Sequence, residues 1–478
     1  MAEYVSSKLR LNFNALFLFI LAYAYASASA ADSNIIKTLP GYPGTLPFKL
    51  ETGYISLGEN GERQLFYYFV ESEGDPNKDP LLFWTMGGPG CSGFSALVYE
   101  IGPLTFDIST FNGSLPDLVY NPYSWTKFAS IIFIDAPVGT GFSYINTSQV
   151  FTSSDTKSTW DHYMFLRKWL LNHPSFIKNR LYVGGHSYGG KAVPMIALEI
   201  VKGNEAGLQP RIRLKGYVTG NAPIDQVQYF NERIPYAHRV ALISDEYYER
   251  AMSSCKGEYL NPDPNNYECL DVLQLIDQCT DNINLNHILL PKCTLSPPNG
   301  DEFTERRMII ENDPIDFLLM SKQEDQWCLL ENHVASYVWA NDPSVQEALY
   351  VRKGMIKDDW KRCNRSLLYE YDVESVLPHH QLLLDKGYEA LVYSGDHDLT
   401  VPYTSTLKWI HSLNLTIEDE WRPWTVDGQV AGYTEKYKKS DLASLTFVTV
   451  KGASHVAPEY MPEQCFAMAK RWFSLFPL

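Results

Sequence analysis

The feature that most constrains this chain is the pentapeptide at residues 185–189, which reads G-H-S-Y-G. It lies between an apolar run at 181–183 and a helix-forming stretch at 192–201. A serine between two glycines at a strand-to-helix junction is typical of a nucleophile elbow, because the tight turn leaves no room for neighbouring side chains. Strain in such a turn lifts the Ser187 hydroxyl clear of the sheet. The spacing therefore predicts a buried strand, an exposed nucleophile and a helix.

An acid and a base follow the serine in the order that this elbow requires. Asp396 ends the segment S-G-D, and His455 ends the segment G-A-S-H. The order Ser…Asp…His is the chain order of α/β-hydrolases. In such a triad His455 takes the proton of Ser187, and Asp396 holds the imidazole in the required tautomer.

Three neighbouring residues compete for these roles. His186 adjoins the serine, but successive side chains diverge at an elbow, so we expect His186 to point into the substrate pocket. His397 and Asp398 compete with His455 and Asp396. An acid two residues beyond another is more typical of a turn or a helix start.

Two backbone N–H groups are expected to bind the oxyanion of a tetrahedral intermediate. One belongs to Tyr188, directly after the nucleophile, and the other to Gly88 in a Gly-Gly-Pro-Gly loop. The segment 88–93 also matches G-x-G-x-x-G, a dinucleotide-binding pattern. Pro89 removes a backbone donor there, and no acidic residue ends a following strand at the usual distance. We therefore predict no cofactor and, since no metal-binding motif occurs, no metal.

Longer segments resemble the serine carboxypeptidase family. They are W-T-M-G-G-P-G-C-S-G at 84–93, D-A-P-V-G-T-G-F-S-Y at 135–144 and S-G-D-H-D at 394–398. The segment 97–104 looks like the plant carboxypeptidase-like branch, which contains acyltransferases that use glucose esters. The resemblance extends from about Leu39 to the C-terminus and implies an α/β-hydrolase fold, with Asp396 as the acid.

The chain divides into a leader, a core and an insertion. Residues 1–30 are predicted to be a secretory signal peptide, whose apolar stretch is too short for a membrane anchor. Residues 31–224 and 340–478 are predicted to form an α/β-hydrolase core with a mixed central sheet. Residues 225–339 are predicted to form a mainly helical, disulfide-linked cap. Within the core, apolar runs predict strands at 64–70, 81–84, 130–135, 181–185, 214–219, 390–393 and 445–450, and other segments predict helices at 160–171, 344–350 and 463–473.

Charge and cysteine content restrict the partners and the compartment. A formal charge of −16 argues against nucleic-acid and anionic-membrane partners. Eight cysteines in a secreted chain favour disulfides. The spacing of the cysteines does not determine which of them pair. The family resemblance implies Cys91–Cys328, Cys255–Cys269 and Cys279–Cys293, with Cys363 and Cys465 as free thiols. Glycosylation sequons occur at Asn112, Asn146, Asn364 and Asn414.

Two positions bear on substrate choice. Carboxypeptidases of the family hold the substrate carboxylate with an Asn and a Glu at the positions of Met86 and His186. A thioether cannot replace a carboxamide donor, which weakens the peptidase interpretation. The acyltransferase branch more often carries Thr and Asp there, so this chain departs from both patterns. With Gly87 and Glu100, these residues form the predicted substrate-binding set, and the apolar Met86 suits an aromatic acyl group.

The resemblance implies an acyltransferase of plant secondary metabolism. Ser187 would take an acyl group from a 1-O-β-glucose ester and pass it to an acceptor alcohol, so the expected partners are small molecules. The alternative is a serine carboxypeptidase that releases C-terminal amino acids at acidic pH. A non-enzymatic binding protein would have lost a triad residue, and none is missing. The expected destination is the vacuole after secretory entry, with an extracellular location as the alternative.

Overall fold

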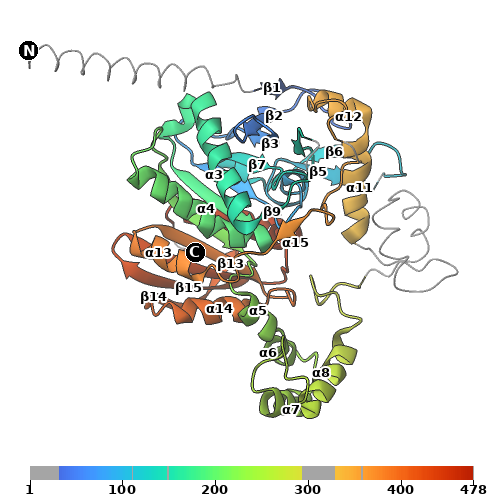
Figure 1. Ribbon diagram of the computed structural model, residues 1–478, viewed down its shortest axis with the longest axis vertical. Helices are drawn as coiled ribbons and strands as arrows, with labels where there is room; N and C mark the ends of the chain where they lie inside the picture. The colour runs from blue at the N-terminus through green and yellow to red at the C-terminus, as the bar shows by residue number, and fades with distance from the viewer. Residues whose placement is uncertain (1–31, 110, 148–149, 293–328, 357–358, 477) are drawn as a thin grey trace, which may run out of the picture.

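The computed structural model describes residues 32–109, 111–147, 150–292, 329–356, 359–476 and 478, and one twelve-stranded sheet dominates it (Figure 1). The strand order is β1-β2-β3-β7-β4-β10-β11-β13-β16-β15-β14, and β8 pairs with β3. The strands from β7 to β16 in this order are parallel, and the flanking pairs are antiparallel. The predicted α/β-hydrolase fold with a mixed sheet is confirmed.

The strands of this sheet are β1 (Asp32–Ile36), β2 (Leu50–Leu57), β3 (Arg63–Val70), β4 (Leu81–Thr85), β7 (Ser130–Ile134), β8 (Tyr144–Ile145), β10 (Leu181–His186), β11 (Leu214–Gly220), β13 (Glu389–Gly395), β14 (Thr416–Val426), β15 (Gln429–Ser440) and β16 (Ala443–Val450). Two small sheets pair β5 (Leu104–Asp107) with β6 (Asp117–Tyr120), and β9 (Ser153–Ser154) with β12 (Tyr369–Glu370). Each strand that the sequence predicted is present within one or two residues of its expected ends.

Most of the described helices cover the two faces of the sheet, and the others extend from one end of it. The described helices are α2 (Gly93–Ser95), η1 (Ala96–Glu100), η2 (Trp125–Lys127), α3 (Asp155–Asn172), η3 (Pro174–Lys178), α4 (Ser187–Glu205), α5 (Gln226–Asn231), α6 (Arg233–Arg239), α7 (Asp245–Cys255), α8 (Tyr267–Thr280), α11 (Leu329–Asn341), α12 (Pro343–Ala348), α13 (Leu377–Asp385), α14 (Tyr403–Ser412), α15 (Ala457–Tyr460) and α16 (Pro462–Phe473). One buried cluster lies under α3, α4 and α13, and the other under η1, α11, α12 and α16. The central strands β4 and β10 are buried along their whole length, as parallel strands covered on both faces must be.

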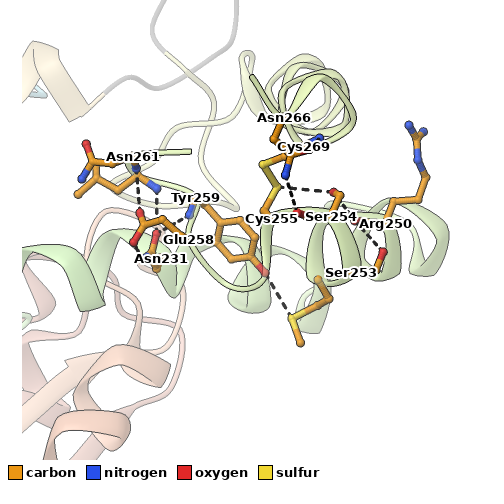
Figure 2. Close-up of a disulfide and its surroundings, with 12 residues drawn as sticks. Asn231, Arg250, Ser253, Ser254, Cys255, Glu258, Tyr259, Asn261, Asn266 and Cys269 are labelled. Atoms are coloured by element: carbon orange, nitrogen blue, oxygen red, sulfur yellow. Dashed lines mark hydrogen bonds between the residues drawn. A yellow bond between two sulfur atoms is a disulfide. The ribbon is translucent and has the colours of Figure 1, made fainter. Parts of the chain in front are cut away.

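Helices α5 to α8 project from one end of the sheet and form the described part of the cap (Figure 1). They bury a small cluster of their own, which includes Tyr236 and Val272. Figure 2 shows the Cys255–Cys269 disulfide, which joins α7 to α8 and confirms that predicted pair. Residues 329–339 of helix α11 belong to the predicted cap, but the Trp339 ring stacks on Phe94 of the core, with ring centroids 4.8 Å apart.

One of the other predicted disulfides is replaced by a different pair. Cys91 is bonded to Cys363 and not to Cys328, so Cys363 is not the free thiol that we expected. The cause is a backbone bridge that brings the segment around Cys363 alongside Cys91. Cys279 is exposed and bonds to no described cysteine, and because its expected partner Cys293 lies outside the described residues, this pair stays a prediction. Cys465 is free and buried as predicted. Cys293, Cys328 and the predicted signal peptide at 1–30 lie outside the described residues.

Candidate active site

The nucleophile elbow lies where β10 ends and α4 begins. Ser187 has a φ of +52°, in the left-handed region that a non-glycine residue adopts only under strain. A Cβ atom on Gly185 would lie 2.6 Å from the carbonyl oxygen of Thr85, and one on Gly189 would lie 2.4 Å from the same atom. Both flanking glycines are therefore required by the close approach of β4. The predicted strand, turn and helix meet at Ser187.

A hydrogen-bonded chain joins Ser187 to a buried acid. Nε2 of His455 lies 2.8 Å from Oγ of Ser187, and Nδ1 of His455 lies 2.8 Å from Oδ2 of Asp398. Asp398 is fully buried, whereas Ser187 is only partly so. The three residues follow β10, β16 and β13, whose carboxyl ends meet at one edge of the parallel sheet. This geometry suits a nucleophile, a general base and the acid that orients the base.

The acid is Asp398, and the predicted assignment to Asp396 is wrong. Oδ1 of Asp396 accepts hydrogen bonds from the N–H of Gly452 at 2.8 Å and from Nδ1 of His397, so Asp396 ties the end of β13 to the loop before His455. Asp398 lies two residues after Asp396 in the turn that follows β13, and its carboxylate is the one that contacts His455. Asp398, which the sequence analysis considered as a competitor, occupies the required position.

Asn221 is a residue of this site that the sequence analysis did not assign. Its Nδ2 donates to Oδ2 of Asp398 at 2.8 Å, and its Oδ1 accepts from the N–H of Gly395 at 3.1 Å. The N–H groups of Thr400 and Val401 donate to the other carboxylate oxygen, at 2.7 and 3.1 Å. These donors fix the carboxylate beside His455. The position of Asn221 directly after a buried strand was the available sequence signal.

The segment 281–292, which follows α8, also contacts the loops that carry His455 and Asp398. The carbonyl oxygen of Asn286 accepts from the N–H of His455 at 3.1 Å and from Oγ of Ser454. The N–H of Ile288 donates to the carbonyl oxygen of His397 at 3.1 Å. The inserted segment thus contacts both loops that carry the base and the acid. No local sequence pattern indicated this role.

The predicted oxyanion loop passes next to the nucleophile. A Cβ atom on Gly87 would lie 2.8 Å from Cβ of Ser187, so no larger residue fits there. Gly88 follows with a φ of +110°. Tyr188 is in the first turn of α4, where N–H groups have no acceptor within the helix. The N–H groups of Gly88 and Tyr188 thus remain the expected oxyanion donors.

The side chain of Asp135 forms hydrogen bonds with the end of the Gly88 loop. Its Oδ1 accepts from Oγ of Ser92 at 2.6 Å and from the N–H of Gly93 at 2.8 Å, and its Oδ2 accepts from the N–H of Phe142 at 2.8 Å. Burial raises the pKa of Asp135 to about 6, and the three hydrogen bonds offset only part of this shift. The side chain of Asp135 therefore binds both of the glycine-rich segments that carry the family resemblance.

The predicted substrate-binding residues lie on the other side of Ser187. Nδ1 of His186 is 3.1 Å from Oε2 of Glu100, and both side chains are almost fully buried. Neither atom makes an aligned hydrogen bond with any described residue. Met86 is 5% exposed and belongs to the core cluster. His186 therefore faces Glu100, whereas the base that contacts Ser187 is His455.

The sequons lie in different environments. Asn112, Asn146 and Asn414 are exposed, whereas Asn364 is half-buried and its Nδ2 donates to the carbonyl oxygen of Gly139 at 2.9 Å. Within the described part of the chain, no group of three or more His, Cys, Asp or Glu side chains has the geometry to hold a metal ion. Among the described helices, none has the length and apolarity needed to cross a membrane.

Comparisons with known proteins bear on the family and the fold of this chain. The profile of the family described as serine carboxypeptidase matches residues 40–475. Serine carboxypeptidase-like 7 of Arabidopsis thaliana is 44% identical over 446 residues, covering 93% of this chain and 94% of the relative. Serine carboxypeptidase-like 11 of the same plant is 46% identical over 93% of this chain and 95% of its own length. The crystal structure of Kex1(delta)p, a prohormone-processing carboxypeptidase from Saccharomyces cerevisiae, has a TM-score of 0.69 at 21% identity, covering 92% of this chain and 94% of the yeast chain.

Proposed function

Because this chain belongs to the serine carboxypeptidase family, we propose that it is a serine-dependent acyltransferase, which moves an aromatic acyl group from a 1-O-β-glucose ester to an acceptor alcohol. The family contains both peptidases and acyltransferases, so the choice between them depends on the substrate pocket. The observation that carries the proposal is the contact between His186 and Glu100 beside Ser187.

This contact disfavours a substrate that carries a free carboxylate. A protonated His186 is neutralised by an ionised Glu100 at 3.1 Å, and a neutral His186 leaves the Glu100 charge uncompensated. The pair therefore has a net charge of zero or −1 while Glu100 is ionised. Met86, at the other clamp position, has no hydrogen-bond donor. A neutral ester avoids the cost of placing an unpaired carboxylate in this buried pocket.

The described residues suffice for acyl transfer in two steps. In the first, Oγ of Ser187 attacks the ester carbonyl carbon while Nε2 of His455 takes its proton, and the N–H groups of Gly88 and Tyr188 stabilise the oxyanion. The protonated His455 then gives the proton to the departing anomeric oxygen, which releases glucose and leaves an acyl-Ser187 ester. In the second step the acceptor hydroxyl attacks this ester, His455 takes its proton and returns it to Ser187, and the acylated acceptor leaves.

The buried Asp135 supports an acidic destination. Its pKa is about 6 in the folded protein because burial disfavours the charged form, so the folded state binds a proton that the unfolded chain has lost above about pH 4. This group therefore favours the folded state most at acidic pH. The dependence agrees with the vacuole as the destination that we propose.

The deciding experiment compares two substrate classes. The glycosylated protein is incubated with hydroxycinnamoyl and aryl-lactoyl glucose esters in a pool of small alcohols, and in parallel with blocked dipeptides. We expect glucose release and acylated alcohols, with the dipeptides left uncut, and no reaction from Ser187→Ala. Robust dipeptide cleavage by the unmodified protein would contradict the proposal and favour a carboxypeptidase in which protonated His186 binds the substrate carboxylate.

A double variant tests the clamp argument directly. Met86→Asn with His186→Glu restores a carboxamide and a carboxyl group next to Ser187. We expect a gain of roughly ten- to a hundredfold in kcat/KM for blocked dipeptides, the equivalent of about 1–3 kcal/mol in substrate binding. Met86→Leu is the matched control, because it fills a similar volume and adds no donor. An equal gain in the control would show that pocket shape, and not the restored clamp, governs dipeptide cleavage.

A further inference from the structure

Another buried carboxylate, that of Asp155, lies at the hydroxyl end of Tyr188, the residue that follows the nucleophile. Asp155 is the first residue of α3 and is 4% exposed. Its Oδ1 accepts hydrogen bonds from the hydroxyl of Tyr188 and, at 2.9 Å, from the hydroxyl of Tyr369. Its Oδ2 accepts from the N–H of Val373 at 3.0 Å. The hydrogen bonds of the triad do not include this carboxylate.

Lys191 completes the group. Its Nζ lies 3.5 Å from Oδ2 of Asp155 and 4.9 Å from the centre of the Tyr188 ring, and it also donates to the carbonyl oxygen of Val373. The Lys191 side chain is 6% exposed. A buried ion pair is weak evidence for stability, because the cost of removing both charges from water offsets much of their attraction. The arrangement is better explained as a device that fixes the position of Tyr188.

Burial favours the donor state of both phenols. It raises the pKa of Tyr188 and of Tyr369 far above the usual value for tyrosine. Both hydroxyls therefore stay protonated and donate to Asp155. The Tyr188 side chain is held at its hydroxyl by the carboxylate and along its ring by Lys191 and Tyr369.

The backbone of Tyr188 is the part that matters for catalysis. Its N–H is one of the two expected oxyanion donors, and it directly follows the strained Ser187. A side chain fixed at its far end restricts rotation of the main chain at its own Cα. A donor that shifts by a few tenths of an ångström loses much of its value, because oxyanion stabilisation depends on donors that are already oriented.

The segment that contains Tyr369 and Val373 also contacts the loop of Gly88, the second expected oxyanion donor. Ten residues before Val373, Cys363 is bonded to Cys91 in the loop that contains Gly88. The N–H of Asn364 donates to the carbonyl oxygen of Gly90 at 2.9 Å. One stretch of chain therefore contacts the Gly88 loop at its start and the Tyr188 anchor at its end.

We propose that Asp155, Lys191 and Tyr369 are positioning residues for the oxyanion hole, which act through the side chain of Tyr188. This inference depends on the proposed role of Ser187 as the nucleophile, but not on whether the acyl group goes to an alcohol or to water. It can therefore be tested with simple esters.

The test uses Tyr369→Phe and Lys191→Met with p-nitrophenyl butyrate and its thionoester, in which sulfur replaces the carbonyl oxygen. Sulfur is a poor hydrogen-bond acceptor, so the thionoester gains little from an oxyanion hole. Loss of one donor typically lowers kcat by about 10²–10³, and a displaced donor should cost less. We expect the acylation rate with the oxygen ester to fall about tenfold in each variant at unchanged KM, while the thionoester rate changes less than twofold.

Two controls separate positioning from general damage. Arg63→Met breaks the ion pair between Arg63 and Asp161, a buried carboxylate on the same helix, which lies 3.1 Å from Nε of Arg63. We expect this variant to lose thermal stability and to keep the wild-type ratio of oxygen-ester to thionoester rates. Ser187→Ala establishes whether the hydrolysis measured depends on the nucleophile at all.

The outcomes are distinguishable. A collapsed ratio in Tyr369→Phe and Lys191→Met, with a preserved ratio in Arg63→Met, supports the inference. An unchanged ratio in both test variants overturns it, even where their melting temperatures fall. Hydrolysis that persists in Ser187→Ala would instead reject the nucleophile assignment that both proposals share.

Discussion

The assignment of the acid to Asp398 leads to a sharp prediction for Asp398→Asn. The new amide group would have to face either the N–H groups of Thr400 and Val401 at Oδ1, or Asn221 and His455 at Oδ2. The first orientation sets an NH2 group against two fixed backbone donors. The second meets one side-chain donor and an imidazole that can change its tautomer. We therefore expect the amide nitrogen to face His455.

This orientation removes the general base. Nδ1 of His455 would accept from the new amide, so Nε2 would carry the proton and could not accept one from Ser187. The equivalent change in serine proteases lowers kcat by about 10⁴, which corresponds to roughly 5.5 kcal/mol in the barrier. We expect a loss of this size in the acylation rate of Asp398→Asn, measured from the release of p-nitrophenol, with KM changed by less than threefold. Activity should recover partly at high pH, where hydroxide can replace the base.

Asp396→Asn is the matched control, two residues away in the same turn. The side-chain oxygen of an asparagine can still accept from the N–H of Gly452, as Oδ1 of Asp396 does at 2.8 Å. We expect less than a tenfold loss from this variant. A 10⁴-fold loss in Asp396→Asn, together with near wild-type activity in Asp398→Asn, would refute the reasoning and restore the assignment made from the sequence.

Two further predictions concern stability. Since burial raises the pKa of Asp135 from 3.8 to about 6, this group should lower the free energy of unfolding by about 2 kcal/mol as the pH rises from 4 to 6, and Asp135→Asn should remove this contribution in urea titrations at several pH values. An Asp135→Asn variant whose stability has the same pH dependence as the wild type would contradict the shift. Cys363→Ser should lower the free energy of unfolding by about 2–5 kcal/mol because it breaks the bond to Cys91, and a variant as stable as the wild type would contradict this.

The parts of the fold that the sequence predicts well are those with a local physical cause. Strands β4 and β10 are buried on both faces and appear as uninterrupted apolar runs. The elbow at Ser187 needs small residues on both sides, and those glycines are adjacent in the sequence. In each case the residues that determine the structure lie within a few positions of one another.

The hairpin of β14 and β15 was not predicted, because it lacks such a local cause. Strand β14 is mostly exposed and its sequence is T-I-E-D-E-W-R-P-W-T-V, with charged residues on consecutive positions and Pro423 inside. This composition resembles a loop more than a strand with one buried face. Pairing with β15, which itself pairs with β16, holds β14 in place.

The two wrong assignments have a related cause. Asp396 and Asp398 are both acids after the same strand, and only the positions of Asn221 and His455 decide which one serves the base. The partner of Cys91 is 272 residues away, and neither candidate has a distinguishing neighbour. Contacts across such separations are set by the packing of the whole core, so residue spacing does not contain them.

The same limit applies to the question of substrate, where the structure adds one contact that supports the proposal. The position of His186 before Ser187 is consistent with two roles. His186 could bind the carboxylate of a substrate, or it could already be paired with another side chain of the protein. Glu100 lies 86 positions earlier, at the end of η1, and its carboxylate is 3.1 Å from Nδ1 of His186. A substrate carboxylate would have to compete with Glu100 for this imidazole at close range, and it would also meet Met86, which has no donor to offer. A neutral glucose ester faces no such competition, and for this reason the pairing of His186, more than its identity, supports the proposed acyl transfer.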